Sequence, residues 1–265
     1  MPDTRTHRGP HPRDAEHFAA KHAPALRSAV EHLSWLLSRG YVNPSALKLV
    51  GDRFDLTDRQ RTAVQRSACS DAARDDRAAR RLRPAELAGK TLRIDGFNLV
   101  TTVEAALGGG VLLRGRDGAT RDMASMHGNY RRVAETRPAL EAIRETLDAA
   151  NPAAVHWLLD RPVSNSGRLA EMIRDAAGSR PWSAACVPDP DVLLRPGARL
   201  VAEGEELGAA AEGFVAVTAD AGVLDRCGPW CDLAEPTVAR ITGRTPWLID
   251  LGRSGRGNGA CDETE

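Results

Sequence analysis

Residues 91–98 read Thr-Leu-Arg-Ile-Asp-Gly-Phe-Asn, and this stretch decides the fold class. Its apolar residues predict a strand that carries the carboxylate of Asp95 at its C-terminal end. Gly96 then lets the backbone turn, and Asn98 offers an amide shortly after it. In open α/β sheets the functional crevice lies outside the C-terminal ends of the strands. Because Asp-Gly is also ordinary turn chemistry, the stretch gains weight only if its pattern recurs.

The same pattern recurs twice further along the chain. The apolar run 154–159 leads into Asp160, and the run 214–218 leads to Asp220, which Asp225 follows five residues later. Neighbouring parallel strands lie about 4.8 Å apart, so three such strands in one sheet would bring their terminal carboxylates together at one edge. Each aspartate can also be interpreted as a helix N-cap, a common role where a strand leads into a helix.

A cluster of carboxylates is unfavourable unless protons or a divalent cation neutralise it. Oxygen ligands without accompanying Cys or His favour Mg²⁺ or Mn²⁺ over Zn²⁺. The chemistry expected of such a metal is activation of water for attack on a phosphodiester. Without metal, at least one of the carboxyl groups should have a raised pKa, because like charges resist joint ionisation.

From residue 91 onward, runs of strand length alternate with helical patterns, which predicts a parallel sheet with helices on both faces. The expected strands are 91–95, 154–159, 182–187 and 214–218, with a last strand at 230–233 or 247–250. The expected helices are 138–150, 166–177 and 221–227. Asp117-Gly118 between two short runs predicts a β-hairpin inserted near the functional end of the first strand.

The region before residue 85 has helical patterns. A first helix is expected from Pro24 to about Gly40, a second from Asn43-Pro44, and a third from a capping box over 57–60. The segment 44–68 has helix-turn-helix dimensions, for which packed helices are the ordinary interpretation and DNA reading the alternative. The mixed-charge helix 70–82 is typical of a solvated connector, and a positive edge facing RNA is its alternative.

At the strand ends the chain resembles the PIN/NYN superfamily of metal-dependent ribonuclease-like domains. The matching stretches are 94–98, 158–160 and 217–220 followed by Asp225. Over roughly 24–242 the chain more closely resembles a bacterial and archaeal family of unknown function, in which a helical DUF434 module precedes a PIN-like DUF5616 domain. That resemblance rests on the stretches 36–41, 45–54, 121–122, 127–131 and 164–167.

The resemblance implies an α/β fold: a PIN-like three-layer domain with a central parallel sheet, preceded by a small all-α module. The expected organisation is a disordered tail over 1–23, a DUF434-like helical module over 24–85, a PIN/NYN-like domain over 90–251 and a disordered tail over 252–265.

The resemblance also implies a set of site residues. The expected catalytic and metal-binding acids are Asp95, Asp160, Asp220 and Asp225. PIN domains often carry a further acid on an intervening helix, for which Glu104, Asp189 and Asp191 are candidates, and Asp191 fits the position best.

Five further residues are expected to position substrate: Asn98, Ser166, Arg168, His127 and Tyr130. The helix start at Ser166 together with Arg168 is a plausible phosphate seat. His127 suits proton transfer, and Tyr130 suits stacking on a base. An ordinary N-cap serine and a loop held by side-chain hydrogen bonds are the structural alternatives.

Composition limits the partners that we expect. The 36 basic residues balance 36 acidic ones, so no overall positive field attracts nucleic acid. Nearly all the basic residues are Arg, which suits bidentate phosphate contacts, although a GC-rich genome explains this equally well. Five scattered Cys favour a reducing cytoplasm over a disulfide framework. No run approaches the ~20 apolar residues of a membrane span, and no signal peptide is expected.

Two functions fit these observations. The first is a metal-dependent RNA phosphodiesterase of the endoribonuclease type, with Mg²⁺ or Mn²⁺ as cofactor and single-stranded or structured RNA as partner. The alternative is a non-catalytic nucleic-acid-binding or regulatory protein on the same fold. The late pair of acids favours the enzyme, and the neutral net charge favours the alternative.

Overall fold

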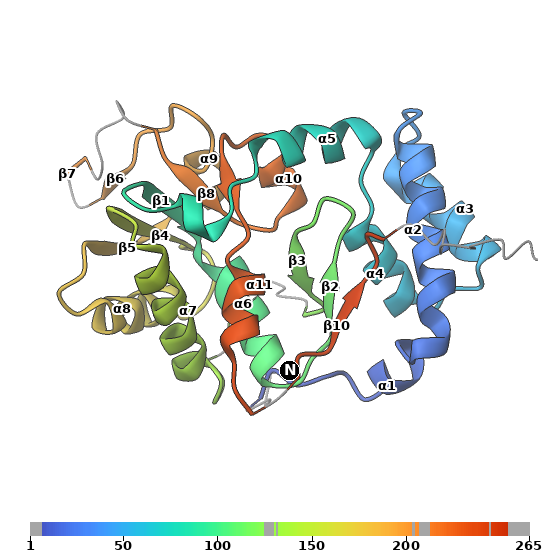
Figure 1. Cartoon of the computed structure of the whole chain (residues 1–265), viewed down its shortest axis with the longest axis horizontal. Coiled ribbons are helices and arrows are strands. Elements are labelled where there is room, and N and C mark those ends of the chain that lie inside the picture. The colour runs from blue at the N-terminus through green and yellow to red at the C-terminus, as the bar shows by residue number, and fades with distance from the viewer. Residues whose placement is uncertain are drawn as a thin grey trace, which may run out of the picture.

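The central element is a five-stranded sheet with the strand order β5-β4-β1-β8-β9, in which every neighbouring pair is parallel (Figure 1). The computed structural model describes residues 7–124, 130, 132–202, 205–206, 213–243 and 245–253. The strands are β1 Thr91–Asp95, β4 Ala154–Asp160, β5 Trp182–Val187, β8 Val215–Val217 and β9 Trp230–Cys231. The expected α/β class and parallel sheet are thus confirmed.

Helices cover both faces of this sheet. On one face lie α6 Gly96–Leu107, α7 Thr136–Ala150, α8 Ser166–Ala177 and α11 Ala234–Arg240. On the other face lie the short helices α9 Pro190–Leu193 and α10 Ala221–Leu224, with α5 Asp71–Arg80 packed against α10. Alternate strand residues face the two layers: Ile94 and Trp157 belong to the first core, whereas Leu158 and Ala216 belong to the second.

A second sheet of three strands confirms the expected hairpin. Its strands are β2 Leu112–Arg114, β3 Thr120–Asp122 and β10 Leu248–Asp250, in the order β10-β2-β3. Both candidates for the last strand are therefore strands, but they belong to different sheets, because β9 joins the central sheet and β10 pairs in parallel with β2. A two-stranded ribbon, β6 Val201–Ala202 and β7 Glu205–Glu206, stands apart from both sheets.

The N-terminal region is helical, as expected. Its elements are α1 Asp14–His17, η1 Ala20–His22, α2 Ala23–Leu37, α3 Asn43–Arg53 and α4 Asp58–Ser67, and η2 Pro84–Glu86 precedes the central sheet. One hydrophobic core joins these helices to the second sheet: Leu33 and Val64 share it with Leu113, Met123 and Leu251. The helical module therefore packs directly against the hairpin, and the two share this core.

Residues 7–23, which we expected to form part of a disordered tail, are ordered. Asp14 is buried and forms an ion pair with Arg59 of α4, while Phe18 is buried in the module core. This difference arises because the partners of this segment lie about 45 residues away in the sequence, beyond the reach of a local pattern. Residues 1–6 and 254–265, which make up most of the rest of the two expected tails, lie outside the described residues.

The capping box that opens α4 is confirmed, and it allows a stability prediction. Thr57 accepts a hydrogen bond from the backbone of Gln60, whose side chain in turn accepts one from the Thr57 backbone. Thr57→Ala removes this bond, so we expect the free energy of unfolding to fall by about 1 kcal/mol in urea titrations. The matched control is Thr62→Ala in the same helix, which should change stability by less than about 0.5 kcal/mol. Equal effects of both substitutions would contradict the assigned role of the cap.

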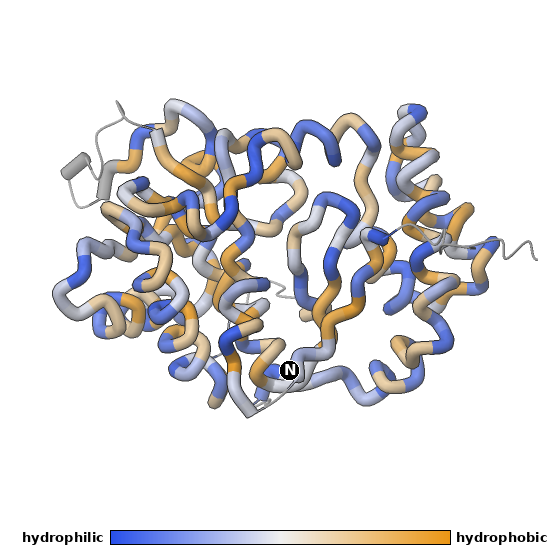
Figure 2. Tube along the Cα trace, viewed as in Figure 1, coloured by the Kyte–Doolittle hydropathy of each residue, from blue (hydrophilic) through white to orange (hydrophobic). Residues whose placement is uncertain are grey.

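Hydrophobic residues concentrate along the central strands and between the layers (Figure 2). Within the described ranges, no helix combines the length and apolar character needed to cross a membrane.

Candidate functional site

Three of the predicted carboxylates lie at one edge of the central sheet. β1 lies between β4 and β8, and all three strands run in the same direction. Asp95 ends β1 beside Leu158 of β4, Asp160 ends β4 two residues later, and Asp220 follows the end of β8. The expectation that Asp95, Asp160 and Asp220 share the C-terminal edge of one parallel sheet is confirmed, but the expected crowding is not, because no three acids of the described residues are grouped closely enough to hold a metal ion.

Hydrogen bonds join the first and last of these strand ends into one unit. Thr218 Oγ1 donates to Asp95 Oδ2 at 3.0 Å, and the same hydroxyl accepts from the backbone N–H of Asp220 at 3.1 Å. Asn98 Oδ1 accepts from the N–H of Ala219 at 2.9 Å. The residues 95–98 and 218–220 are therefore coupled directly, and Asn98 serves to hold the β8–α10 loop. Sequence reasoning gave Thr218 no role, since a threonine at a strand end is unremarkable on its own.

Both aspartates of this unit are also helix caps. Asp95 Oδ1 accepts from the N–H of Asn98 at 3.4 Å and begins α6. Asp220 Oδ1 accepts from the N–H groups of Gly222 and Val223 at 2.8 and 3.0 Å and begins α10. Among the described residues, the second oxygen of Asp220 accepts no hydrogen bond. Capping thus accounts for part of each carboxylate's bonding and leaves acceptor capacity facing the sheet edge.

The electrostatic environment links the acids at this edge. Burial raises the pKa of Asp95 to about 7; the neighbouring Asp220 and Asp191 add to the rise, and the hydrogen bonds from Thr218 and Asn98 oppose it. Burial also raises the pKa of Asp191, with the charges of Asp220, Asp189 and Asp160 adding to it. The expected raised pKa in the cluster is confirmed, and its main cause is desolvation, with like-charge repulsion second.

The three candidates for the intervening acid occupy different places. Asp191, on α9, interacts electrostatically with Asp95, Asp160 and Asp220 and so lies at the same edge. Asp189 caps α9 by accepting from the N–H of Asp191 at 3.0 Å. Glu104 lies about two turns along α6 and is fully buried. There it forms an ion pair with Arg8 and accepts hydrogen bonds from Tyr130 and Thr136, so Glu104 is not part of the edge cluster.

Asp225 departs from the expectation. It lies at the end of α10 and forms an ion pair with Arg77 of α5 at 2.6 Å. The reason is helical geometry: five residues after Asp220, a short helix has turned this side chain toward α5, away from the sheet edge.

A buried ionic network supports the β8–α10 loop, and sequence reasoning missed it. Asp117 of the hairpin turn pairs with Arg77 at 2.5 Å and with Arg121 at 2.6 Å. Arg121 also donates from Nε to the carbonyl of Ala219 at 2.7 Å. Burial alone would raise the pKa of Asp117, but Arg121 and Arg77 outweigh it and hold the pKa at about 2. The Asp-Gly signal at 117–118 was interpreted only as a turn. Arg77 lies 40 residues earlier in the sequence, and no local pattern indicates that Arg121 pairs with Asp117.

Of the predicted substrate-positioning residues only Asn98 is placed beside the acids by a described hydrogen bond, and its side-chain oxygen is engaged by Ala219. Ser166 is buried and donates to the carbonyls of Asp160 and Val163, so it stabilises the loop before α8 and offers no free hydroxyl. Arg168 is exposed on α8 and makes no ion pair among the described residues. His127 lies outside the described residues.

Tyr130 corrects the expected base-stacking role. It is only 2% exposed, its ring packs on Phe97 with a centroid separation of 5.1 Å, and its hydroxyl donates to Glu104 at 2.6 Å. The motif around it was interpreted as an exposed loop because it is polar and contains glycine. The burial of Tyr130 follows from a partner on α6 that the local pattern does not reveal.

The fit of the acids to a cation follows from their spacing. Among the described residues, no three His, Cys, Asp or Glu side chains are grouped closely enough to hold a metal ion directly. The edge acids are nevertheless all oxygen donors, and each of Asp95, Asp160 and Asp191 has a raised pKa. Mg²⁺ is usually bound by one or two carboxylates and keeps several of its waters. The donor set therefore fits a partly hydrated hard cation better than a fully enclosed one.

Fold and site together define an α/β protein with a parallel sheet whose C-terminal edge carries acidic residues, joined to an N-terminal helical region. The chain belongs to the family of the domain of unknown function DUF5616, whose model matches residues 84–236. The model of a second family, the protein of unknown function DUF434, matches residues 25–80. An uncharacterized protein of Methanocaldococcus jannaschii is 30% identical over 173 residues, which cover 64% of this chain and 83% of that protein. No solved structure matches.

Proposed function

We propose that this protein is a metal-dependent phosphodiesterase of the PIN/NYN type that acts on RNA, with Mg²⁺ or Mn²⁺ as its cofactor. One observation carries the proposal: Asp95 and Asp220, from two adjacent parallel strands, are joined through the hydroxyl of Thr218 at the sheet edge, where functional crevices of open α/β sheets lie. The resemblance of the strand ends to PIN/NYN domains supports the assignment of the reaction.

Asp95 and Asp220 would hold the cation directly, and Asp191 and Asp160, which lie at the same edge, would contact its coordinated waters. Burial together with the negative charge of its neighbours raises the pKa of Asp95 to about 7, so a cation at this position would relieve an unfavourable ionisation. When bound, a divalent cation lowers the pKa of a coordinated water and neutralises charge on a phosphodiester.

The chain's own residues have distinct tasks in this proposal. Thr218 holds the Asp95 carboxylate through Oδ2, while the N–H of Asn98 holds Oδ1, so both oxygens have fixed directions. Asn98 also anchors Ala219 and thereby keeps Asp220 at its distance from Asp95. Arg121 supports the same loop from the opposite side through the Ala219 carbonyl. Thr218, Asn98 and Arg121 are therefore positioning residues, and the carboxylates act on the cation and substrate.

The test measures cleavage and binding on the same labelled RNAs, with Mn²⁺ and with EDTA. Asp95→Asn and Asp220→Asn should each reduce metal-dependent cleavage of single-stranded RNA at least about 100-fold, since each removes a formal charge that holds the cation. The amide is nearly isosteric, so thermal melts should show an intact fold.

Asp175→Asn, an exposed acid of α8, is the control and should retain full cleavage. Wild-type protein that binds RNAs of diverse sequence but cleaves none of them would contradict the catalytic proposal.

A specific observation favours a second candidate, a non-catalytic nucleic-acid-binding or regulatory protein. Within the described residues no group is ready-made to hold a metal, and Asp225 is engaged by Arg77. In that case Asp95→Asn should leave RNA affinity unchanged, and Mn²⁺ should not alter the melting temperature of the wild type.

A further inference from the structure

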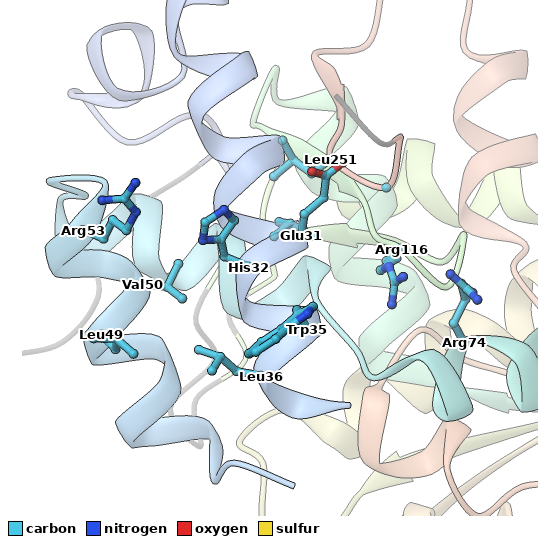
Figure 3. A pocket seen from close by; sticks show the side chains of 12 residues that line it. Glu31, His32, Trp35, Leu36, Leu49, Val50, Arg53, Arg74, Arg116 and Leu251 are labelled. Atoms are coloured by element: carbon cyan, nitrogen blue, oxygen red, sulfur yellow. The ribbon is translucent and has the colours of Figure 1, made fainter. Parts of the chain in front are cut away.

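The helical module carries a groove of about 790 Å³ that is separate from the acidic edge (Figure 3). It crosses the exposed side of α2, from α3 to the hairpin loop. Its floor is apolar and consists of Val30, Leu36, Val50 and Leu251. Trp35 stands in the middle of the groove and is 53% exposed, although a tryptophan of a monomeric domain is usually covered.

Arginines flank this apolar floor on both sides. Arg53 of α3 stands at one end, and Arg74 of α5 and Arg116 of the hairpin loop stand at the other. The guanidinium of Arg39 stacks on the Trp35 ring, 3.6 Å from its centroid. Among the described residues, Arg53 has no ion-pair partner.

Acidic residues reduce this charge, mainly at the end formed by Arg74 and Arg116. Asp71 pairs with Arg74 at 3.5 Å and with Arg116 at 2.6 Å, and Asp75 pairs with Arg74 at 2.8 Å. Glu31 also lines the groove. Arg116 is nevertheless held by its two bonds in a fixed orientation, because its Nη1 donates to the Cys69 carbonyl at 3.2 Å. A fixed guanidinium retains further N–H donors for an anion.

We propose that this groove binds single-stranded RNA, with a base stacked at Trp35 and phosphates at Arg53 on one side and at Arg116 on the other. Guanidinium N–H donors at both ends of an apolar floor suit a chain in which planar rings alternate with anionic groups. An acyl chain carries its charge at one end only, and an apolar helix of a partner protein carries no anionic groups that would pair with arginines on two sides. The exposed aromatic ring with a stacked arginine supplies the sequence-tolerant platform typical of single-strand binding.

Helix α5 contributes to the groove and also contacts the β8–α10 loop. Arg74 lines the groove, and one turn further Arg77 pairs with Asp225 and donates to the carbonyl of Ala221, next to Asp220. The choice of RNA over single-stranded DNA rests on the proposed function, and the binding site itself rests on the groove.

The test measures affinity without cleavage. A fluorescein-labelled 12-nucleotide RNA of mixed sequence is titrated by anisotropy in EDTA, with Asp95→Asn as the background so that no cleavage can occur. Trp35→Ala should weaken binding at least about 5-fold, as expected for one lost base stack, whereas Trp35→Phe should stay within about 3-fold of the parent. Arg53→Glu should weaken binding and reduce its dependence on salt. Arg240→Glu, an equal charge reversal at an exposed position of α11, is the matched control and should change neither the affinity nor its salt dependence.

The side chains of Trp35 and Arg53 are exposed, so circular dichroism and thermal melts should match the parent protein. Unchanged affinity of Trp35→Ala would overturn the proposal, as would the absence of binding at low salt. A dimer that Trp35→Ala converts to a monomer, with RNA affinity unaltered, would instead assign the groove to a second copy of the chain. Binding in the groove without Mn²⁺-dependent cleavage by the wild type would contradict the proposed phosphodiesterase activity and support the proposed binding site.

Discussion

Asp117→Ala is expected to lower the free energy of unfolding by about 3–5 kcal/mol, the largest effect on stability that we predict. Asp117 is buried between the guanidinium groups of Arg77 and Arg121, from two separate elements. Removing the carboxylate leaves Arg121 as a buried cation without its ionic partner and weakens the tie between α5 and the hairpin. Equilibrium urea unfolding measures this loss.

A matched control is available on the surface. Asp148 also lies between two arginines, Arg144 at 3.2 Å and Arg180 at 2.5 Å, but all three side chains are considerably exposed. Asp148→Ala should cost less than about 1 kcal/mol, because solvent screens exposed ion pairs and side-chain entropy opposes them. Similar losses for Asp117→Ala and Asp148→Ala would show that the buried network contributes no more to stability than the exposed one.

The Asp117 network also predicts a pH dependence. The pKa of Asp117 in the folded protein is about 2, below its ordinary value of 3.8. The ionised carboxylate therefore contributes about 2 kcal/mol at neutral pH, fully present above about pH 4 and lost as the pH falls through about 2. The stability difference between wild type and Asp117→Asn should shrink over this window. A difference that stays constant from pH 5 to pH 2 would contradict the assignment.

Asp95→Asn is expected to act in the opposite direction and to stabilise the protein in the absence of metal. The folded-state pKa of Asp95 is raised to about 7, so ionisation is unfavourable in the native state. Wild-type stability should fall as the pH rises from about 4 through about 7, whereas the amide is immune to this loss. Because Asp95 is partly exposed and the amide is a weaker acceptor for Thr218, we expect a gain of about 1–3 kcal/mol at pH 8.

Divalent cations should reverse the order of stability of wild type and Asp95→Asn. If Asp95 takes part in holding a cation, Mn²⁺ at millimolar concentration should raise the melting temperature of the wild type and leave that of Asp95→Asn unchanged. Melts are recorded at pH 8 in EDTA and in Mn²⁺, with Asp175→Asn as a variant that should follow the wild type in both. Equal shifts for wild type and Asp95→Asn would locate the cation elsewhere.

Sequence reasoning succeeded where a local pattern carries the physical cause. The strand at 91–95 and the helix at 166–177 match the observed bounds, and the Thr57 capping box is present as expected. Apolar periodicity, turn residues and caps act within a few positions along the chain. The carboxyl edge could also be predicted, since parallel strands place their C-terminal ends on one side of the sheet.

The assignments that failed concern side chains with distant partners. Asp225 follows a strand and a short helix, where a metal-binding acid was expected, yet it forms an ion pair with Arg77, 148 residues earlier. Tyr130 and Ser166 were expected to face substrate and instead form internal hydrogen bonds. Nothing within several positions of these residues distinguishes an exposed polar group from a buried one with a partner.

The sequence by itself determined the α/β class, the helical N-terminal region and the edge at which Asp95, Asp160 and Asp220 end their strands, because hydrophobic period and strand polarity are local properties. Only the tertiary structure decided which acids interact, that Thr218 joins Asp95 to Asp220, and that Arg77 and Arg121 enclose Asp117. These pairings depend on how layers from distant parts of the chain pack. The free energy of a buried charge or hydrogen bond is set by that packing and by the exclusion of water.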